Sequence, residues 1–288
     1  MENNTNLADV NNPSKVYALF YSFFLIPLML TIFGVLFFFL FKMLTYEKQD
    51  PYYLLNNIKS GSLTKRWQSA YELSNLMTDP SKIPYDALFV NQMINMYEQS
   101  IHDDSRVRTY LALAMGQTGN ILFGDVLING LEDSSLENRI AAIKALGSIK
   151  YIPAVTKLNN IVKSKDSKQE RLAAIISLGE IKEKSSLDIL IKSLDDEEAN
   201  IRWDSAISLY KMNNNSGVHI IKKLLNREYY FNYPNVDINE TSNTILTVLA
   251  LISGRPLSDF KDQLQILSQK EENIKIREFS MKILVEHY

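Results

Sequence analysis

The chain has 288 residues, of which 46% are hydrophobic and 22% are charged, as in ordinary folded proteins. Its formal net charge of −2 provides no overall attraction to nucleic acids. The absence of cysteine excludes disulfides, thiolate metal sites and a cysteine nucleophile, and ten glycines and eight prolines are too few for an all-β domain with many tight turns.

The N-terminal region is predicted to be a membrane anchor behind a polar tail. Residues 1–15 are rich in asparagine and are expected to be disordered, whereas no charged side chain occurs from Val16 to Phe41. A helix over residues 16–42 is long enough to cross a bilayer core of about 30 Å with some tilt, and Pro27 is able to kink it. A cleaved signal peptide is the alternative, but its apolar core should have only about 7–15 residues.

Basic residues beside the anchor predict its orientation. Only Lys15 precedes the apolar segment. Five basic residues follow it: Lys42, Lys48, Lys59, Lys65 and Arg66. The positive-inside rule therefore places the C-terminal part in the cytoplasm, behind a short linker at residues 43–50. We expect a single-pass protein of the inner (cytoplasmic) membrane, with an extracytoplasmic location as the alternative.

One helical motif recurs over residues 51–288. Its clearest copy is Arg139-Ile-Ala-Ala-Ile-Lys-Ala-Leu-Gly147. The equivalent first positions are Arg66, Arg108, Arg139, Arg171, Arg202, Ser242 and Arg277. The four central copies follow one another at 31, 32 and 31 residues, and a fixed period of this size is typical of repeat proteins.

Each motif is predicted to be an amphipathic helix. Apolar residues three, four and seven positions after the first residue form one stripe. Small residues in the motif, including Gly116, Gly147 and Gly179, should let a neighbouring helix approach closely. A shorter apolar helix is expected before each motif. Such helix pairs cannot bury their apolar faces alone, so they should stack into an α-solenoid.

Two helix starts are read as capping boxes. Ser134 with Glu137, and Ser167 with Glu170, have the Ser-x-x-Glu spacing in which serine caps the backbone and glutamate reaches back.

The motif Arg-φ-Ala-Ala-φ-x-x-Leu-Gly, preceded by a short helix and an acidic turn, resembles the bacterial HEAT-like repeat first associated with phycobilin lyases. The resemblance covers residues 51–288 and is tightest over 121–212. It implies a right-handed curved stack of antiparallel helix pairs, and a mode of binding rather than an activity. The predicted fold class is therefore all-α, an α-solenoid of about seven HEAT-like helix pairs preceded by one transmembrane helix.

The arginines that open the motifs are interpreted as structural. Because they recur at equivalent positions, they are expected to pair with turn acids such as Asp133 and Asp196, or with a carboxylate of a neighbouring repeat. This ladder comprises Arg66, Arg108, Arg139, Arg171, Arg202 and Arg277.

Six aromatic residues depart from the repeat pattern and are candidates for binding a partner. Trp67 and Trp203 occupy the same position in the first and fifth repeats, where they either pack against the next helix or anchor a partner on the inner surface. Residues 226–240 lengthen the connection inside the sixth repeat. This insertion contains Tyr229, Tyr230, Phe231 and Tyr233, and forms either an aromatic plug over its own repeat or a partner-binding loop.

No residues are assigned to catalysis, to a metal or to a cofactor. His102, His219 and His287 lie outside any His-Glu pair, so the di-iron site of HEAT-like hydroxylases is not expected. The predicted function is a membrane-anchored scaffold or adaptor for another protein, such as a membrane transporter or a secretion complex. Alternatives are a lyase-like or chaperone-like enzyme subunit that holds a cofactor or client on its concave face, and an extracytoplasmic envelope-assembly factor.

Overall fold

The computed structural model describes residues 20–44, 50–164 and 166–288. The predicted tail at 1–15 and most of the predicted linker lie outside these residues. The chain divides into two compact units, Met1–Gln49 and Asp50–Tyr288. The described residues form helices, turns and loops without any β-strand, which confirms the all-α class.

The described part of the first unit is one continuous helix. A π-helical turn, Tyr21–Leu25, leads into α2, Ile26–Leu44. Pro27 explains this turn, because proline lacks an N–H and its ring clashes with the carbonyl four residues earlier unless the helix widens. The window Tyr21–Met43 has a mean hydropathy of 2.7 and no buried residue. Among the described helices it alone is long and apolar enough to cross a membrane, a property that anchors share with signal sequences.

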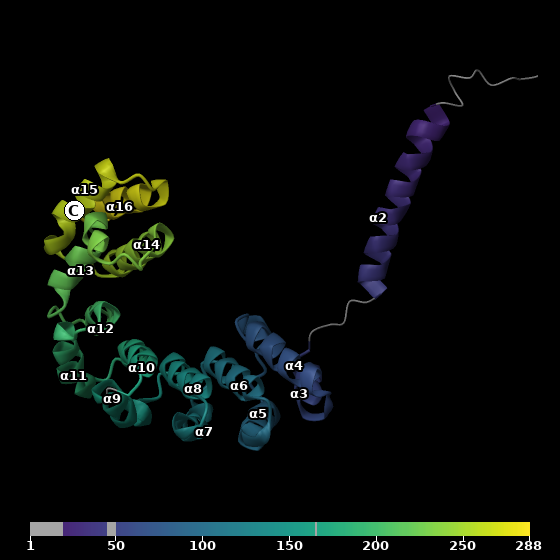
Figure 1. Cartoon of the computed structure of the whole chain (residues 1–288), viewed down its shortest axis with the longest axis horizontal. Helices are drawn as coiled ribbons and strands as arrows, with labels where there is room; N and C mark the ends of the chain where they lie inside the picture. The colour runs from purple at the N-terminus through teal and green to yellow at the C-terminus, as the bar shows by residue number, and fades with distance from the viewer. Residues whose placement is uncertain (1–19, 45–49, 165) are drawn as a thin grey trace, which may run out of the picture. The chain divides into compact units, whose positions relative to one another are not determined.

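The second unit consists of seven helix pairs, as predicted. The first helices of the pairs are α3 (Pro51–Ser60), α5 (Ala87–Gln99), α7 (Gly124–Asn129), α9 (Val155–Lys163), α11 (Leu187–Lys192), α13 (Val218–Leu224) and α15 (Lys261–Lys270). The second helices are α4 (Leu63–Leu76), α6 (Ser105–Gln117), α8 (Leu136–Ser148), α10 (Lys168–Ile181), α12 (Ala199–Lys211), α14 (Ile238–Gly254) and α16 (Ile274–His287). The pairs stack into a curved array in which the second helices line the inner side (Figure 1).

Glycine allows the central second helices to pack closely. A Cβ atom on Gly147 would lie 2.6 Å from the side chain of Ser177, and one on Gly179 would lie 2.6 Å from Cβ of Ser208. Gly116 fits against α8 in the same way. These contacts confirm that the small residues of the motif permit a close approach between neighbouring helices.

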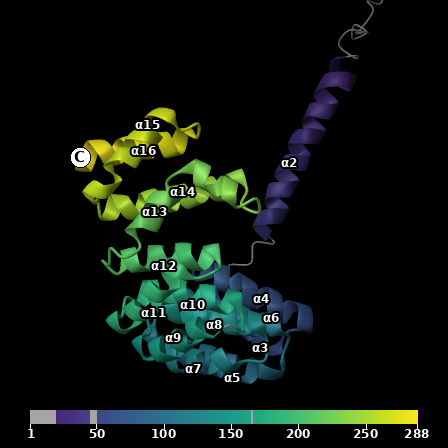
Figure 2. The same cartoon turned by 60° about the vertical axis from the view of Figure 1, so that its left-hand side comes forward.

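The step from α12 to α14 is wider than the steps before it (Figure 2). Tyr210 occupies the motif position of the three glycines and is buried. Its ring packs edge-on against Phe260 at 5.8 Å, and the guanidinium of Arg255 lies over it at 4.6 Å. Since a tyrosine requires far more room than a glycine, the second helices cannot stay in close contact here.

One of the two predicted helix caps is wrong by one residue. The N-cap of α8 is Ser135 and not Ser134, and its Oγ accepts a hydrogen bond from the Asn138 N–H. The carbonyl of Ser134 accepts from an arginine side chain, and the Ser135 N–H donates to Asp133 Oδ1 at 2.9 Å, so the turn continues to Ser135 before α8 begins. Ser167 does cap α10, and its Oγ accepts from the Glu170 N–H at 3.2 Å. The Glu170 carboxylate pairs with Arg139, so only the serine half of this predicted capping box is confirmed.

Candidate functional site

The arginines of the motif form a ladder along the edge of the solenoid where the loops inside each helix pair lie. Each guanidinium reaches a polar side chain of the following repeat. The pairs are Arg66 with Asp103, Arg108 with Asp133 (2.6 Å), Arg139 with Glu170 (2.7 Å), Arg171 with Asp196, and Arg202 with the hydroxyl of Tyr233 (3.2 Å). The predicted acceptors Asp133 and Asp196 are thus each bound by the arginine of the preceding repeat.

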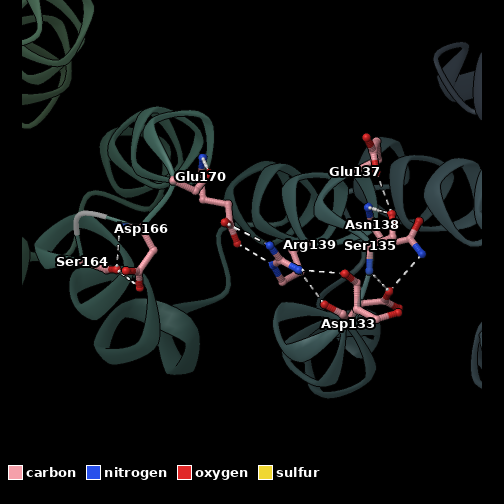
Figure 3. A network of polar contacts seen from close by, with 10 residues as sticks. Asp133, Ser135, Glu137, Asn138, Arg139, Ser164, Asp166 and Glu170 are labelled. Atoms are coloured by element: carbon pink, nitrogen blue, oxygen red, sulfur yellow. Dashed lines mark hydrogen bonds and ion pairs between the residues drawn. The ribbon is translucent and has the colours of Figure 1, made fainter.

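The same arginines also bind their own repeat. Arg139 Nη1 donates to the carbonyl of Asp133 at 2.8 Å, so that it joins this turn to Glu170 in the next repeat (Figure 3). Arg277, in the last repeat, donates to the carbonyl of Glu271 at 2.7 Å. One side chain therefore ties the end of a first helix to the next helix pair, as expected of a structural ladder.

The sixth repeat keeps the ladder with a substitute arginine that the sequence interpretation missed. Ser242 stands where the other repeats have arginine, and Arg227 from the insertion donates to its Oγ at 3.2 Å. Arg227 also pairs with Glu271 of the seventh repeat at 2.6 Å. Although burial opposes it, hydrogen bonding from Arg227 and from the Asn273 N–H lowers the pKa of Glu271. In the sequence, the serine at the arginine position of the sixth motif was the sign that another residue supplies the guanidinium.

Both tryptophans pack against the repeat that follows them. The indole of Trp67 is half-buried beneath the guanidinium of Arg106, which lies 4.3 Å from the ring centroid. Trp203 is buried, and three rings of the insertion surround it at 4.9–6.1 Å: Tyr229, Tyr230 and Tyr233. Of the two alternatives that the sequence left open for these tryptophans, the structure shows the first, packing against the next repeat.

The three tyrosines of the insertion form hydrogen bonds as well as packing contacts. Tyr230 donates to the carbonyl of Leu224 at 2.9 Å, and burial raises its pKa well above the ordinary value. The hydroxyls of Tyr229 and Tyr233 lie 3.0 Å apart, and Tyr233 takes the place of a ladder carboxylate for Arg202. These residues form a plug, but it covers the fifth repeat rather than only its own.

Phe231 is the exception within the insertion. Its side chain is 79% exposed and borders a groove of about 600 Å³ between α13 and α15, on the outer side of the array. Ile266, 55% exposed, also lines this groove, and Lys223 and Lys270 contribute charged groups. Because Glu228, Glu271 and Glu272 also line it, the groove offers apolar surface bordered by charged groups of both signs, a combination suited to protein recognition.

A second hollow lies on the inner side, at the wide step between α12 and α14. This cavity of about 460 Å³ is lined by Asp204, Asp237, Glu240, Asn243 and Thr247, among others. Burial raises the pKa of Asp204 to about 6, although the charge of Lys211 opposes this shift. The sequence interpretation did not single out Asp204, because an isolated aspartate on a helix carries no signal until its neighbours are known.

Comparison with known proteins identifies the type of fold. A family model described as HEAT repeats matches residues 155–231, and no curated protein sequence matches the chain. The complex of CpcE and CpcF of phycocyanin lyase from a Nostoc species is similar with a TM-score of 0.54 and 18% identity, over 84% of this chain and 96% of that chain. The Escherichia coli protein YibA has a TM-score of 0.46 and 15% identity, over 81% of each chain. The seven helix pairs, the matched repeats and the likeness to the CpcE–CpcF complex together make this fold a HEAT-like α-solenoid.

Proposed function

We propose that the solenoid is a non-catalytic scaffold that binds another protein, and that α2 tethers it to the inner membrane. The observation that carries this proposal is the exposure of Phe231 beside the groove between α13 and α15. Its neighbours Tyr229, Tyr230 and Tyr233 are used for internal packing, whereas Phe231 contributes nothing comparable to the fold. Aromatic side chains at the centre of a small apolar area are typical of protein-binding hot spots.

The partner that fits this surface is a protein segment that places an apolar side chain between Phe231 and Ile266. Acidic groups beside that side chain would be matched by Lys223 and Lys270 on the walls of the groove. The short connection at residues 45–49 keeps the solenoid near the bilayer, so a partner in the same membrane, such as a transporter or a secretion complex, is the favoured class.

The test compares the partners of wild-type protein with those of two surface variants. Phe231→Ser removes the exposed ring at the groove, and Val285→Ser removes an equally exposed apolar side chain on α16 as a control. Quantitative pull-down from native membranes is expected to lose one defined partner with Phe231→Ser and to keep it with Val285→Ser. The same partners at the same levels with all three proteins would contradict the proposal.

A second candidate is a subunit that holds a small cofactor or client on the inner face. Its support is the cavity at Asp204, a half-buried carboxyl with a pKa raised by burial in a polar hollow. Native mass spectrometry of protein purified from its source tests this candidate. A bound small molecule that is retained by wild type and lost from Asp204→Asn would support it, whereas the mass of the chain alone in both samples would count against it.

A further inference from the structure

The loops that connect successive helix pairs form the edge opposite to the arginine ladder, and part of this edge is apolar. Five large hydrophobic residues there are 58–67% exposed: Tyr85, Leu88, Ile121, Leu122 and Ile152. They lie at or just before the starts of α5, α7 and α9, which are consecutive first helices in the array (Figure 1). We call these five residues the apolar ridge.

The apolar ridge is distinguished by the charge around it rather than by exposure alone. The ladder edge also has large hydrophobic residues that are 58–79% exposed: Leu63, Ile101, Phe231, Ile238 and Ile274. Exposed hydrophobic residues are normal on a protein surface, so the charge of each edge decides which of the two can meet an anionic membrane. The loops themselves are held by other residues, since Tyr151 donates to Asp125 at 2.6 Å and Phe123 is fully buried. The exposed side chains beside these residues are therefore not needed to close the loops.

The two edges of the solenoid differ strongly in charge. The loops inside the helix pairs contain 13 acidic and 2 basic residues, a net charge of −11, over 61–62, 100–104, 130–135, 164–167, 193–198, 225–237 and 271–273. The loops between pairs contain 4 acidic and 5 basic residues, a net charge of +1, over 77–86, 118–123, 149–154, 182–186, 212–217 and 255–260. An anionic lipid surface repels the first edge and not the second.

The solenoid also begins on the edge that carries the apolar ridge. Asp50 caps the start of α3, and Tyr52 in the first turn of that helix donates to Asp86, the N-cap of α5, at 2.5 Å. Only residues 45–49 separate Asp50 from the end of α2. Six Cα–Cα steps span at most about 23 Å, so Asp50 lies within that distance of Leu44, the last residue of α2.

We propose that the apolar ridge docks onto the lipid surface of the membrane in which α2 is anchored. This inference rests on the proposed tether. The ridge residues insert among the headgroups, as apolar side chains of interfacial helices do, while the acidic edge faces away from the bilayer. The outer groove at Phe231 lies elsewhere on the solenoid, so lipid docking and partner binding use different surfaces.

The absence of cysteine permits a direct test on the full chain. Single-cysteine variants Leu88→Cys, Leu122→Cys and Ile152→Cys probe the ridge, Glu197→Cys probes the acidic edge and Leu36→Cys probes α2. Each is labelled with an environment-sensitive fluorophore and reconstituted into vesicles of phosphatidylcholine and phosphatidylglycerol, with or without lipids that carry a spin label near the headgroup. All five positions are solvent-exposed in the fold, so circular dichroism should show unchanged helix content.

The expected result is blue-shifted emission and loss of fluorescence to the spin-labelled lipid at the three ridge positions, with no change at position 197. Ridge labels that stay unquenched while a label at position 36 is quenched would overturn lipid docking and leave the tether intact. Blue-shifted but unquenched ridge labels would assign the ridge to a protein partner and also overturn lipid docking. A label at position 36 that no lipid quencher reaches, including one carried on the acyl chain, would instead contradict the tether itself.

Discussion

The stack from α6 to α12 and the step from α12 to α14 are built from the same kind of helix pair, but they differ at equivalent positions. In the stack, glycines such as Gly147 and Gly179 let successive helices touch, and arginine–carboxylate pairs tie the repeats together. At the step, Tyr210 replaces the glycine and Tyr233 replaces the carboxylate. The cavity at Asp204 lies at this irregular step, whereas the groove beside Phe231 lies between the sixth and seventh helix pairs. The two proposed sites therefore occur in the less regular C-terminal repeats, although smaller hollows also line the stack.

The largest expected effect is the loss of a buried ladder pair in the stack. The side chains of Arg108 and Asp133 are only 7% and 6% exposed, so Arg108→Met leaves an uncompensated buried carboxylate. We expect a loss of about 3–5 kcal/mol in the free energy of unfolding, measured by urea denaturation. The double variant Arg108→Met/Asp133→Leu should recover much of this loss. Equal losses in the single and double variants would show that the pair is not the cause.

A smaller effect is expected from filling the close contact between α8 and α10. In Gly147→Ala the new methyl group would lie 2.6 Å from Ser177, which forces the helices apart and should cost about 1–3 kcal/mol. Gly254→Ala is the matched control, because no atom lies within 4 Å of its added Cβ. If both variants unfold at the same urea concentration, the stack is not as tightly packed as the structure indicates.

The pH dependence of stability tests the step between α12 and α14. Burial raises the pKa of Asp204 from 3.8 to about 6, so the folded state favours the neutral carboxyl more than the unfolded state does. Wild-type stability is therefore expected to fall as the pH rises from about 4 to about 6, and to stay lower above that range. Asp204→Asn should remove this fall and stabilise the protein by about 1–2 kcal/mol at pH 7, allowing for partial exposure. Parallel stability curves for the two proteins from pH 4 to 8 would contradict the assignment.

The smallest effect is expected where the substitute arginine continues the ladder. The side chain of Arg227 is 28% exposed. The buried Glu271 carboxylate, 5% exposed, would still accept from the Asn273 N–H and keep the nearby charge of Arg277. Arg227→Met should therefore cost only about 1 kcal/mol, less than Arg108→Met in the stack. Adding Ser242→Arg, which returns arginine to its usual motif position, should restore stability if Arg227 acts as its substitute. If the double variant is no more stable than Arg227→Met, an arginine at position 242 does not replace Arg227 and the proposed substitution is wrong.

The sequence predicted the regular part of this protein well, because the repeat period and the spacing of apolar residues can be read directly from the order of residues. The period of 31–32 residues, the stripe of apolar positions and the small residues were sufficient for seven helix pairs and for their close packing. The cap at Ser134 was assigned one residue early, because two adjacent serines precede the helix and the sequence does not show at which of them its first turn begins.

The sequence by itself determined the α-solenoid, the apolar N-terminal helix and the position of the aromatic insertion. Only the tertiary structure decided that Trp203 is covered by three tyrosines, that Phe231 alone among the insertion aromatics remains exposed, and that Arg227 reaches Ser242 and Glu271. The reason is that helix formation and repeat stacking depend on neighbours three, four and about thirty residues away. The direction of a side chain in an irregular loop depends instead on contacts between repeats that no fixed period encodes.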